Sequence, residues 1–218
     1  MNCIKRITLI LLLIVALAGV ATNQQATNRH EACLRALTRT LDLPSILPAC
    51  GIITNGQGHG SCVAIDSDLI LTAGHCIGHE GSWVEIGGVK YDILDEWRSE
   101  QYDIGFVRID DQVPYLQLGE MPKLLDTVYF VGSPYEICFV NTITKGIISH
   151  LDRDVYDRID LIQTDAEGAP GSSGCALVDI QGHIIGICVA GPNPGGGVTL
   201  CEPVSHILEA LEEYNAAH

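Results

Sequence analysis

From residue 51 onward the apolar positions come in short runs, rich in β-branched residues and separated by Gly, Asp and Asn. Such runs predict short strands rather than helices. Many short strands with turn residues between them indicate an all-β sandwich or barrel, not a parallel α/β sheet. The predicted strands are 61–65, 69–73, 89–97, 105–109, 127–132, 140–149, 161–164, 175–178, 184–189 and 198–201.

Two prolines and one hairpin turn organise this β region. Pro114 and Pro122 bracket a loop that divides it into two comparable halves. The segment Asp179-Ile180-Gln181-Gly182 lies between two apolar runs and predicts a hairpin turn.

Apolar positions with helical spacing occur only near the two ends. Residues 31–41 predict a helix that ends before Pro44 and Pro48. Residues 205–214 predict a second helix, with Ser205 as its N-cap.

The first residues have the pattern of an export signal. Lys5 and Arg6 precede the apolar run 7–20, which is followed by small residues suited to cleavage. This run is shorter than the roughly 20 residues that span a bilayer, so a cleaved signal peptide is favoured over a membrane anchor. We therefore expect a signal peptide at 1–22, an extension with a short helix at 23–55, and a protein that is secreted or periplasmic. Contact with a membrane is expected only through an uncleaved signal segment.

Charge and cysteine content restrict the partners further. The net charge is −15, and such an acidic surface repels phosphate backbones, so no nucleic-acid partner is expected. Beyond Cys3 the chain has eight cysteines, an even number that predicts disulfides in an exported protein without fixing their connectivity. The sequence leaves the oligomeric state open.

The segment Gly171-Ser172-Ser173-Gly174 is the first candidate for chemistry. A serine between glycines can supply a nucleophile, and the N–H groups of Gly171 and Ser173 can converge on an oxyanion. Alone, this tetrapeptide would be a plain Gly-Ser turn. Ser172 competes as nucleophile, but the flanking glycines favour Ser173.

Two upstream residues complete a possible catalytic set. His75 follows the apolar run 69–71, which places its imidazole at the rim of a sheet, and the alternative is a satisfied core histidine. Asp103 precedes a buried strand, where a carboxylate must be paired. A bond from this carboxylate to the imidazole would leave the other ring nitrogen free to act as a base. Asp103 could also be a strand-edge turn residue, and Asp92 and Asp95 are weaker candidates for the role.

These residues carry a resemblance to trypsin-like (chymotrypsin-fold) serine proteases, closest to the exported bacterial HtrA/Deg type. The matching segments are 71–75, 103–107, 131–135 with 142–149, 164–166, 170–174, 176–177 and 203–205. The resemblance covers about residues 56–214. It implies two six-stranded antiparallel β-barrels with the active site between them, and it carries His75, Asp103 and Ser173 over as the triad.

The resemblance also implies a domain division and a function. The protease domain would be 56–218, with barrel one at about 56–118, barrel two at about 124–204 and the C-terminal helix at 205–214. The protein would be an exported serine endopeptidase that acts on proteins or peptides, with no cofactor and no metal. A PDZ domain after the helix is not expected. Ser172 stands where digestive trypsins have an acid, so activation by a newly cut N-terminus is not expected. Cys175 replaces a usual glycine, which leaves an inactive, binding version of the fold as an alternative.

The resemblance extends to the substrate pocket and the cysteine pairs. Glu167, six residues before Ser173, would lie at the base of a pocket with Val189 and Gly191 and would favour Lys or Arg at the cleavage site. The alternative is that Glu167 points to solvent. The resemblance implies a Cys62–Cys76 disulfide. The residues themselves suggest two more: Cys175–Cys188 would bridge the predicted hairpin, with Cys138 and Cys201 as alternatives for either partner, and Cys33–Cys50 would tie the N-terminal helix to the first barrel.

A zinc-binding module is the main alternative from another class. His59, Cys62, His75, Cys76 and His79 have metal-like spacing. If His75 were a ligand it could not be a base, and the Ser173 segment would then have no explanation.

Overall fold

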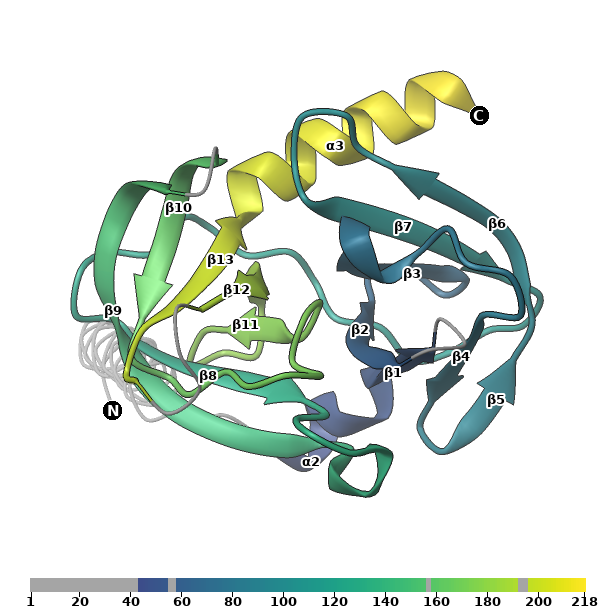
Figure 1. Ribbon diagram of the computed structural model, residues 1–218, viewed down its shortest axis with the longest axis horizontal. Coiled ribbons are helices and arrows are strands. Elements are labelled where there is room, and N and C mark those ends of the chain that lie inside the picture. Colours follow the sequence, from purple (N-terminus) through teal and green to yellow (C-terminus); the bar gives the residue numbers. More distant parts are fainter. Residues whose placement is uncertain (1–42, 55–57, 156–157, 192–195) are drawn as a thin grey trace, which may run out of the picture. The chain divides into compact units, whose positions relative to one another are not determined.

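Two antiparallel β-sheets make up most of the protein, and one C-terminal helix contacts both (Figure 1). The computed structural model describes residues 43–54, 58–155, 158–191 and 196–218. The predicted signal peptide and the predicted helix at 31–41 lie outside these residues. None of the helices in the described ranges is long and apolar enough to cross a membrane.

The first sheet has seven strands in the order β5-β4-β1-β2-β3-β7-β6. A short helix, α2 (Leu43–Ile46), and a 3₁₀ turn, η1 (Leu47–Ala49), lead directly into it. Its strands are β1 (Cys50–Thr54), β2 (His59–Ala64), β3 (Leu69–Ala73), β4 (Trp83–Ile86), β5 (Val89–Tyr91), β6 (Ile93–Arg98) and β7 (Ile104–Ile109).

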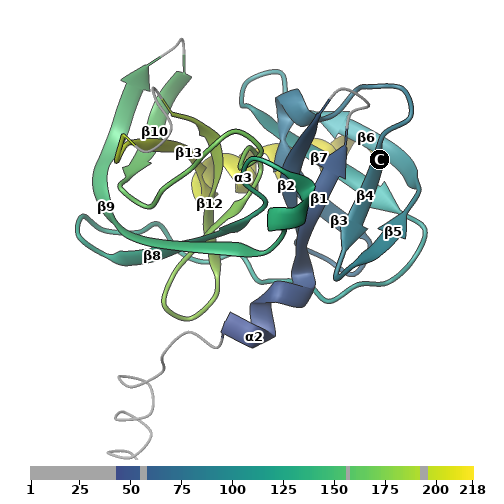
Figure 2. The same cartoon turned by 60° about the horizontal axis from the view of Figure 1, so that its bottom comes forward.

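The second sheet is a closed six-stranded barrel in the order β10-β13-β12-β11-β8-β9. Closure leaves it without a free edge. Its strands are β8 (Thr127–Gly132), β9 (Thr142–Val155), β10 (Arg158–Thr164), β11 (Ala176–Val178), β12 (Ile184–Ala190) and β13 (Thr199–Pro203), with a 3₁₀ turn, η3 (Ile137–Phe139), before β9. Figure 2 shows the two sheets side by side with the C-terminal helix behind them.

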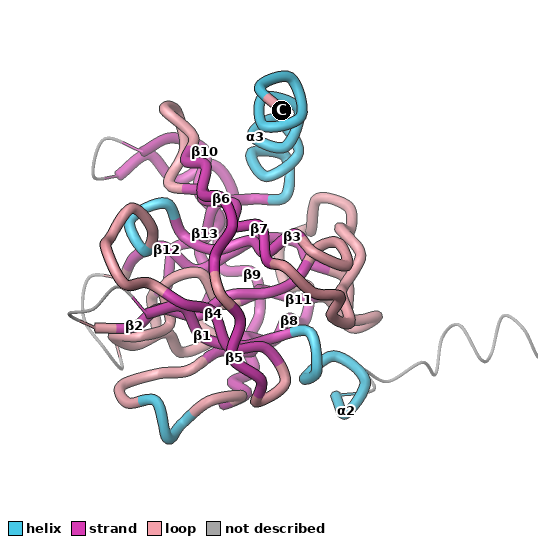
Figure 3. The backbone as a smooth tube through the Cα atoms, turned by 90° about the vertical axis from the view of Figure 1, so that its right-hand side faces the viewer, coloured by secondary structure: helices cyan, strands magenta, loops and turns pink. Residues whose placement is uncertain are grey.

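The C-terminal helix α3 (Val204–Ala217) fastens the two halves together. It leaves β13 of the barrel and lays Tyr214 against Phe106 of β7 and Trp97 of β6, at ring-centroid distances of 5.4 and 5.9 Å. Aromatic contacts of this kind add about 0.5–1.5 kcal/mol beyond the area they bury. Figure 3 shows α2 and α3 at the periphery and the strands in the centre.

The all-β prediction with a C-terminal helix is confirmed, with differences in detail. The first half is a seven-stranded sheet rather than a six-stranded barrel, because β1, which lies within the predicted extension 23–55, pairs with β2 and β4. The run 89–97 forms two strands, β5 and β6. The helix starts at Val204 after Pro203, and no side chain caps it, so the prediction of Ser205 as N-cap was wrong.

The seven described cysteines are all free thiols, so the expected pairs Cys62–Cys76 and Cys175–Cys188 are not formed. The strand register explains why Cys62 and Cys76 are not bonded. A Cβ atom on Gly60 would lie 2.5 Å from Cys76 Sγ, so Gly60, not Cys62, faces Cys76. In the barrel, the backbone of Cys188 lies opposite that of Cys201 on the neighbouring strands β12 and β13. The Cys188 backbone N–H donates to the Cys175 carbonyl oxygen. Cys33 lies outside the described residues.

Candidate active site

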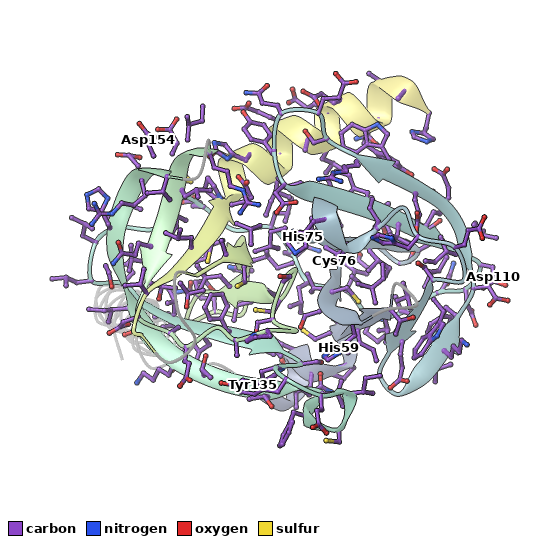
Figure 4. All side chains as sticks on the ribbon, in the orientation of Figure 1. His59, His75, Cys76, Asp110, Tyr135 and Asp154 are labelled. Carbon is purple, nitrogen blue, oxygen red and sulfur yellow. The ribbon has the colours of Figure 1, made fainter. Side chains whose placement is uncertain are left out.

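His75 and Asp103 are brought together by the pairing of β3 with β7. Ala73 at the end of β3 lies opposite Ile104 at the start of β7, so the residues just beyond these ends are neighbours. His75 sits in the 3₁₀ turn η2 (Gly74–Cys76), and its Nδ1 lies 2.7 Å from Asp103 Oδ2. The His75 backbone N–H donates to Asp103 Oδ1 at 2.9 Å. Figure 4 shows His75 and Cys76 close together, between the two halves.

The surroundings of this pair favour a charged carboxylate and a basic imidazole. Burial raises the pKa of the Asp103 carboxyl, but the hydrogen bond and charge of His75, together with the charge of Arg158, outweigh it and leave that pKa below 3.8. The Asp103 hydrogen bond, followed by the contact with Cys76, raises the pKa of His75 to about 10. The pair can therefore hold the imidazole in one tautomer and accept a proton on Nε2.

Ser173 lies on a turn that packs against the histidine segment. Its carbonyl accepts a hydrogen bond from Ser61 N–H at 2.7 Å and one from Cys76 Sγ at 3.8 Å. His75 and Ser173 are both described, and no hydrogen bond joins their side chains. Such bonds are often long without substrate and tighten when it binds.

The structure distinguishes the two adjacent serines. Ser172 is buried, and its Oγ accepts a hydrogen bond from Ala169 N–H at 3.2 Å. Ser173 is half-buried and lines a cavity. A nucleophile must reach the substrate, so this difference favours Ser173.

The backbone around Ser173 leaves two N–H groups available. Ser172, Gly174 and Cys175 donate their N–H groups to carbonyls, whereas Gly171 and Ser173 donate to no partner in the described chain. The Pro170 carbonyl accepts from Tyr135 N–H. Since the C=O and N–H of one trans peptide point in opposite directions, Gly171 N–H points away from that bond. Two unused N–H groups beside a serine can bind an oxyanion.

We expect Gly171→Ala to lower kcat by about 10²–10³-fold, the usual effect of losing one oxyanion donor. Gly171 has φ +90°, and a Cβ there would lie 2.6 Å from the Ser133 carbonyl oxygen, so the peptide must shift. Single-turnover acylation rates measure the effect. Gly81→Ala is the control, because Gly81 has φ +77° but open space around its Cβ position. Equal rates for the Gly171 variant and the wild type would contradict this role.

A cavity of about 270 Å³ adjoins Ser173. Small, uncharged residues line it: Gly168, Ala169, Pro170, Ser173, Cys188, Ala190, Gly191 and Thr199. Gly191 is therefore in the pocket as expected. A larger cavity of about 690 Å³ lies beside the linker 118–123 and contains none of the predicted site residues.

The other two expected pocket residues lie outside the lining. Val189 is buried without facing the cavity, and Glu167 is exposed, with its carbonyl accepting a hydrogen bond from Thr144 Oγ1 at 3.0 Å. The placement of Glu167 at the base of the pocket was thus wrong. Counting back six residues assumed a loop that turns inward, whereas Gly168 and Ala169 occupy the wall.

The zinc hypothesis fits the geometry poorly. His59 lies apart from His75 in Figure 4, and its Nε2 is 2.9 Å from the Ser133 carbonyl oxygen. In the part of the chain that is described, no group of three or more His, Cys, Asp or Glu side chains is arranged to hold a metal ion.

Three residues near Asp103 were not predicted from the sequence. Arg158 Nη2 lies 2.7 Å from Asp103 Oδ2. Glu202 Oε1 accepts the Asp103 backbone N–H at 3.2 Å, and Glu202 Oε2 pairs with His206 Nδ1 at 2.7 Å. Glu202 had a detectable sign in the sequence: it is an acid inside an apolar strand, where a carboxylate needs a partner.

The chain is similar in sequence to known proteins. A family described as "Trypsin-like peptidase domain" matches residues 60–187. The serine protease HTRA1A of Danio rerio is 33% identical over 173 residues, which cover 74% of this chain and 35% of that protein. The serine protease HTRA4 of Mus musculus is 31% identical, over 75% of this chain and 35% of its own length. The chain thus spans about a third of the length of these relatives.

Solved structures agree with the sequence relatives. The serine endoprotease from Yersinia pestis superposes with a TM-score of 0.70 at 27% identity, covering 78% of this chain and 64% of that one. The HtrA-type protease AlgW, solved with a tripeptide, gives a TM-score of 0.68 at 26% identity, covering 78% and 61%. Two bacterial relatives are named as periplasmic DegP-like endoproteases. The chain belongs to the trypsin-like peptidase domain family, and its relatives there are HtrA-type serine proteases.

Proposed function

We propose that this protein is a serine endopeptidase in which His75, Asp103 and Ser173 form the catalytic triad. The observation that carries the proposal is the His75–Asp103 hydrogen bond of 2.7 Å next to a pocket that Ser173 lines. Family membership supports it. Catalysis of this kind needs a nucleophile, a base held in one tautomer and oxyanion donors, and the site supplies a candidate for each.

In the proposed reaction, Ser173 Oγ attacks the substrate carbonyl carbon while its proton moves to His75 Nε2. The N–H groups of Gly171 and Ser173 stabilise the negative oxygen of the tetrahedral intermediate. The C–N bond then breaks, and His75 gives the proton to the leaving amine. Water, deprotonated by His75, attacks the acyl-enzyme and releases the acid and free Ser173.

Hydrolysis of unfolded casein tests this proposal. We expect Ser173→Ala to lower the rate by about 10⁶-fold, because the nucleophile is lost. Ser172→Ala is the matched control and should remain active, since Ser172 is buried beneath the turn. A Ser173→Ala protein that cleaves as fast as the wild type would refute the mechanism.

We also propose that the pocket selects small aliphatic side chains rather than the basic ones expected from Glu167. The lining is uncharged and the carboxylate of Glu167 is exposed, so nothing in the pocket offsets the desolvation of a bound Lys or Arg. Paired peptides with Val or Arg before the scissile bond test this. We expect kcat/KM to favour Val by at least about tenfold. Equal values, or a preference for Arg, would contradict it.

Export is part of the proposal, based on the apolar segment after Lys5 and Arg6 and on the periplasmic names of two relatives. Cell fractionation with N-terminal sequencing tests it. We expect a mature chain in the exported fraction that begins near residue 23.

A further inference from the structure

Arg158, at the start of β10, reaches across from the barrel to the carboxylate of Asp103. Its Nη2 donates to Asp103 Oδ2 at 2.7 Å, and its Nη1 lies 3.4 Å from the Val189 carbonyl oxygen. The two anchors come from different elements, so the planar guanidinium is held at both ends. Arg158 is only 28% exposed at its side chain and Asp103 only 6%.

Arg158 and His75 share one oxygen. Asp103 Oδ2 lies 2.7 Å from both His75 Nδ1 and Arg158 Nη2, while Oδ1 takes the His75 backbone N–H. A guanidinium stays charged at every accessible pH. Because its bond is charge-assisted and largely shielded from water, it fixes the rotation of the carboxylate more firmly than a neutral donor would.

We propose that Arg158 is a positioning residue for the His75–Asp103 pair: it locks the carboxylate that orients His75 and opposes the accumulation of positive charge on the imidazole. The proposal rests on the proposed function for its catalytic meaning. The geometry itself, a cation on the carboxylate oxygen that binds His75, does not depend on that function.

Two effects of Arg158 act in the same direction. A nearby positive charge disfavours a second one, so Arg158 disfavours the imidazolium. By donating to Oδ2, it also makes the carboxylate a weaker acceptor for His75. Removing Arg158 should therefore raise the pH at which His75 loses its proton.

The other ionisable groups around the pair are weaker candidates for this effect. They are Cys76 in η2, Arg98 at the end of β6, Glu202 in β13 and His206 in α3. Arg98 lies beside Gly74 without a hydrogen bond to Asp103. Glu202 accepts the Asp103 backbone N–H, and His206 pairs with Glu202. Apart from His75 itself, Arg158 is the only described residue whose positive charge forms a salt bridge with the Asp103 carboxylate.

The test follows the His75 ring by NMR and kcat/KM by kinetics, both against pH. We expect Arg158→Met to raise the His75 midpoint by about one unit, the low end of the effect of a neighbouring charge. At pH values below both midpoints, kcat/KM of the variant should therefore be about tenfold lower than that of the wild type. At pH values above both midpoints, it should be near the wild-type value. Arg158→Lys keeps the positive charge, so its His75 midpoint should lie close to the wild-type value.

Two further variants make the test decisive. Arg158→Gln keeps a donor for Asp103 and removes the charge, so it should shift the midpoint in the same direction, and it replaces Arg158→Met if that variant does not fold. Lys145→Met removes a positive charge from β9 that lies over the Tyr129 ring and forms no salt bridge with Asp103, so it should leave the midpoint unchanged. Circular dichroism confirms that each variant is folded.

The proposal would be overturned by a folded Arg158→Met or Arg158→Gln protein with an unchanged or lowered midpoint. A loss of kcat/KM that is the same at every pH would also overturn it, since that indicates packing alone. Failure of the proposed function is separable: a wild type that hydrolyses nothing still shows, by NMR, whether Arg158 sets the midpoint of His75.

Discussion

Asp103→Asn should lower kcat by about four orders of magnitude while KM changes little, because the carboxylate acts on the transition state through His75. The carboxylate accepts from His75 Nδ1 at 2.7 Å and from its backbone N–H at 2.9 Å. An asparagine amide in its place carries no negative charge and can turn an N–H group toward His75 Nδ1. The imidazole then takes the wrong tautomer. Steady-state kinetics on a fluorogenic peptide with Val before the scissile bond measures the loss.

The pH dependence of kcat/KM provides a second measurement on the Asp103→Asn variant. The bond to Asp103 raises the pKa of His75 to about 10, so in the wild type kcat/KM should rise with pH and level off only above about pH 10, where the imidazole is neutral. Asp103→Asn lacks the carboxylate that raises the pKa of His75, so kcat/KM should rise at lower pH than in the wild type. Asp110→Asn is the control, because Asp110 lies at the far edge of the molecule in Figure 4. An unchanged profile in Asp103→Asn would show that the carboxylate does not act on His75.

Glu202→Leu and His206→Leu should each destabilise the protein by about 1–3 kcal/mol, because each leaves a buried hydrogen-bonding partner unsatisfied. Glu202 is 1% exposed and His206 5%. His206 also stacks on the ring of Tyr102, at a centroid distance of 4.0 Å. Either substitution leaves its partner buried without its acceptor or donor. Urea unfolding at 25 °C measures the free energies.

The double variant is the matched control. With both partners replaced by leucine, neither side chain of the Glu202–His206 hydrogen bond stays buried without its partner, so the loss should be smaller than the sum of the single losses. Part of the loss should remain, because the Asp103 backbone N–H still lacks the acceptor that Glu202 provides. Single variants that lose less than about 0.5 kcal/mol would show that this hydrogen bond does not stabilise the protein in solution.

The sequence predicted best where a strand is a single apolar run with clear ends. The bounds of β3 and β8 agree with the predicted runs, since Asp68 and Gly74 flank the first and Asp126 precedes the second. β4 was missed because it is short and lies between glycine-containing turns. β1 was missed because it directly follows the prolines that end the predicted helix and lies inside the predicted extension 23–55.

The site could be predicted only as far as its chemistry is local in sequence. His75, Asp103 and Ser173 each sit in a segment whose own residues indicate the role. Arg158 and Glu202 meet Asp103 across 55 and 99 residues of chain, and neither periodicity nor composition reports such a contact. The pocket prediction depended on the path of one loop: Gly168 and Ala169 line the pocket, whereas Glu167 just before them is exposed.

The buried thiols illustrate the same limit. Burial raises the pKa of Cys50 to about 12 and raises the pKa values of Cys62, Cys175 and Cys201 well above 9, so all four are weak nucleophiles. Cysteine spacing indicated disulfides, but the strand register decides which side chains face one another.

Covalent labelling with a fluorophosphonate, followed by peptide mass spectrometry, tests the central claim most directly. We expect one adduct on Ser173, its loss in Ser173→Ala, its retention in Ser172→Ala, and a greatly slowed reaction in Asp103→Asn. A folded wild-type protein that remains unlabelled, or an adduct on Ser172, would contradict the assignment of His75, Asp103 and Ser173 as a working triad.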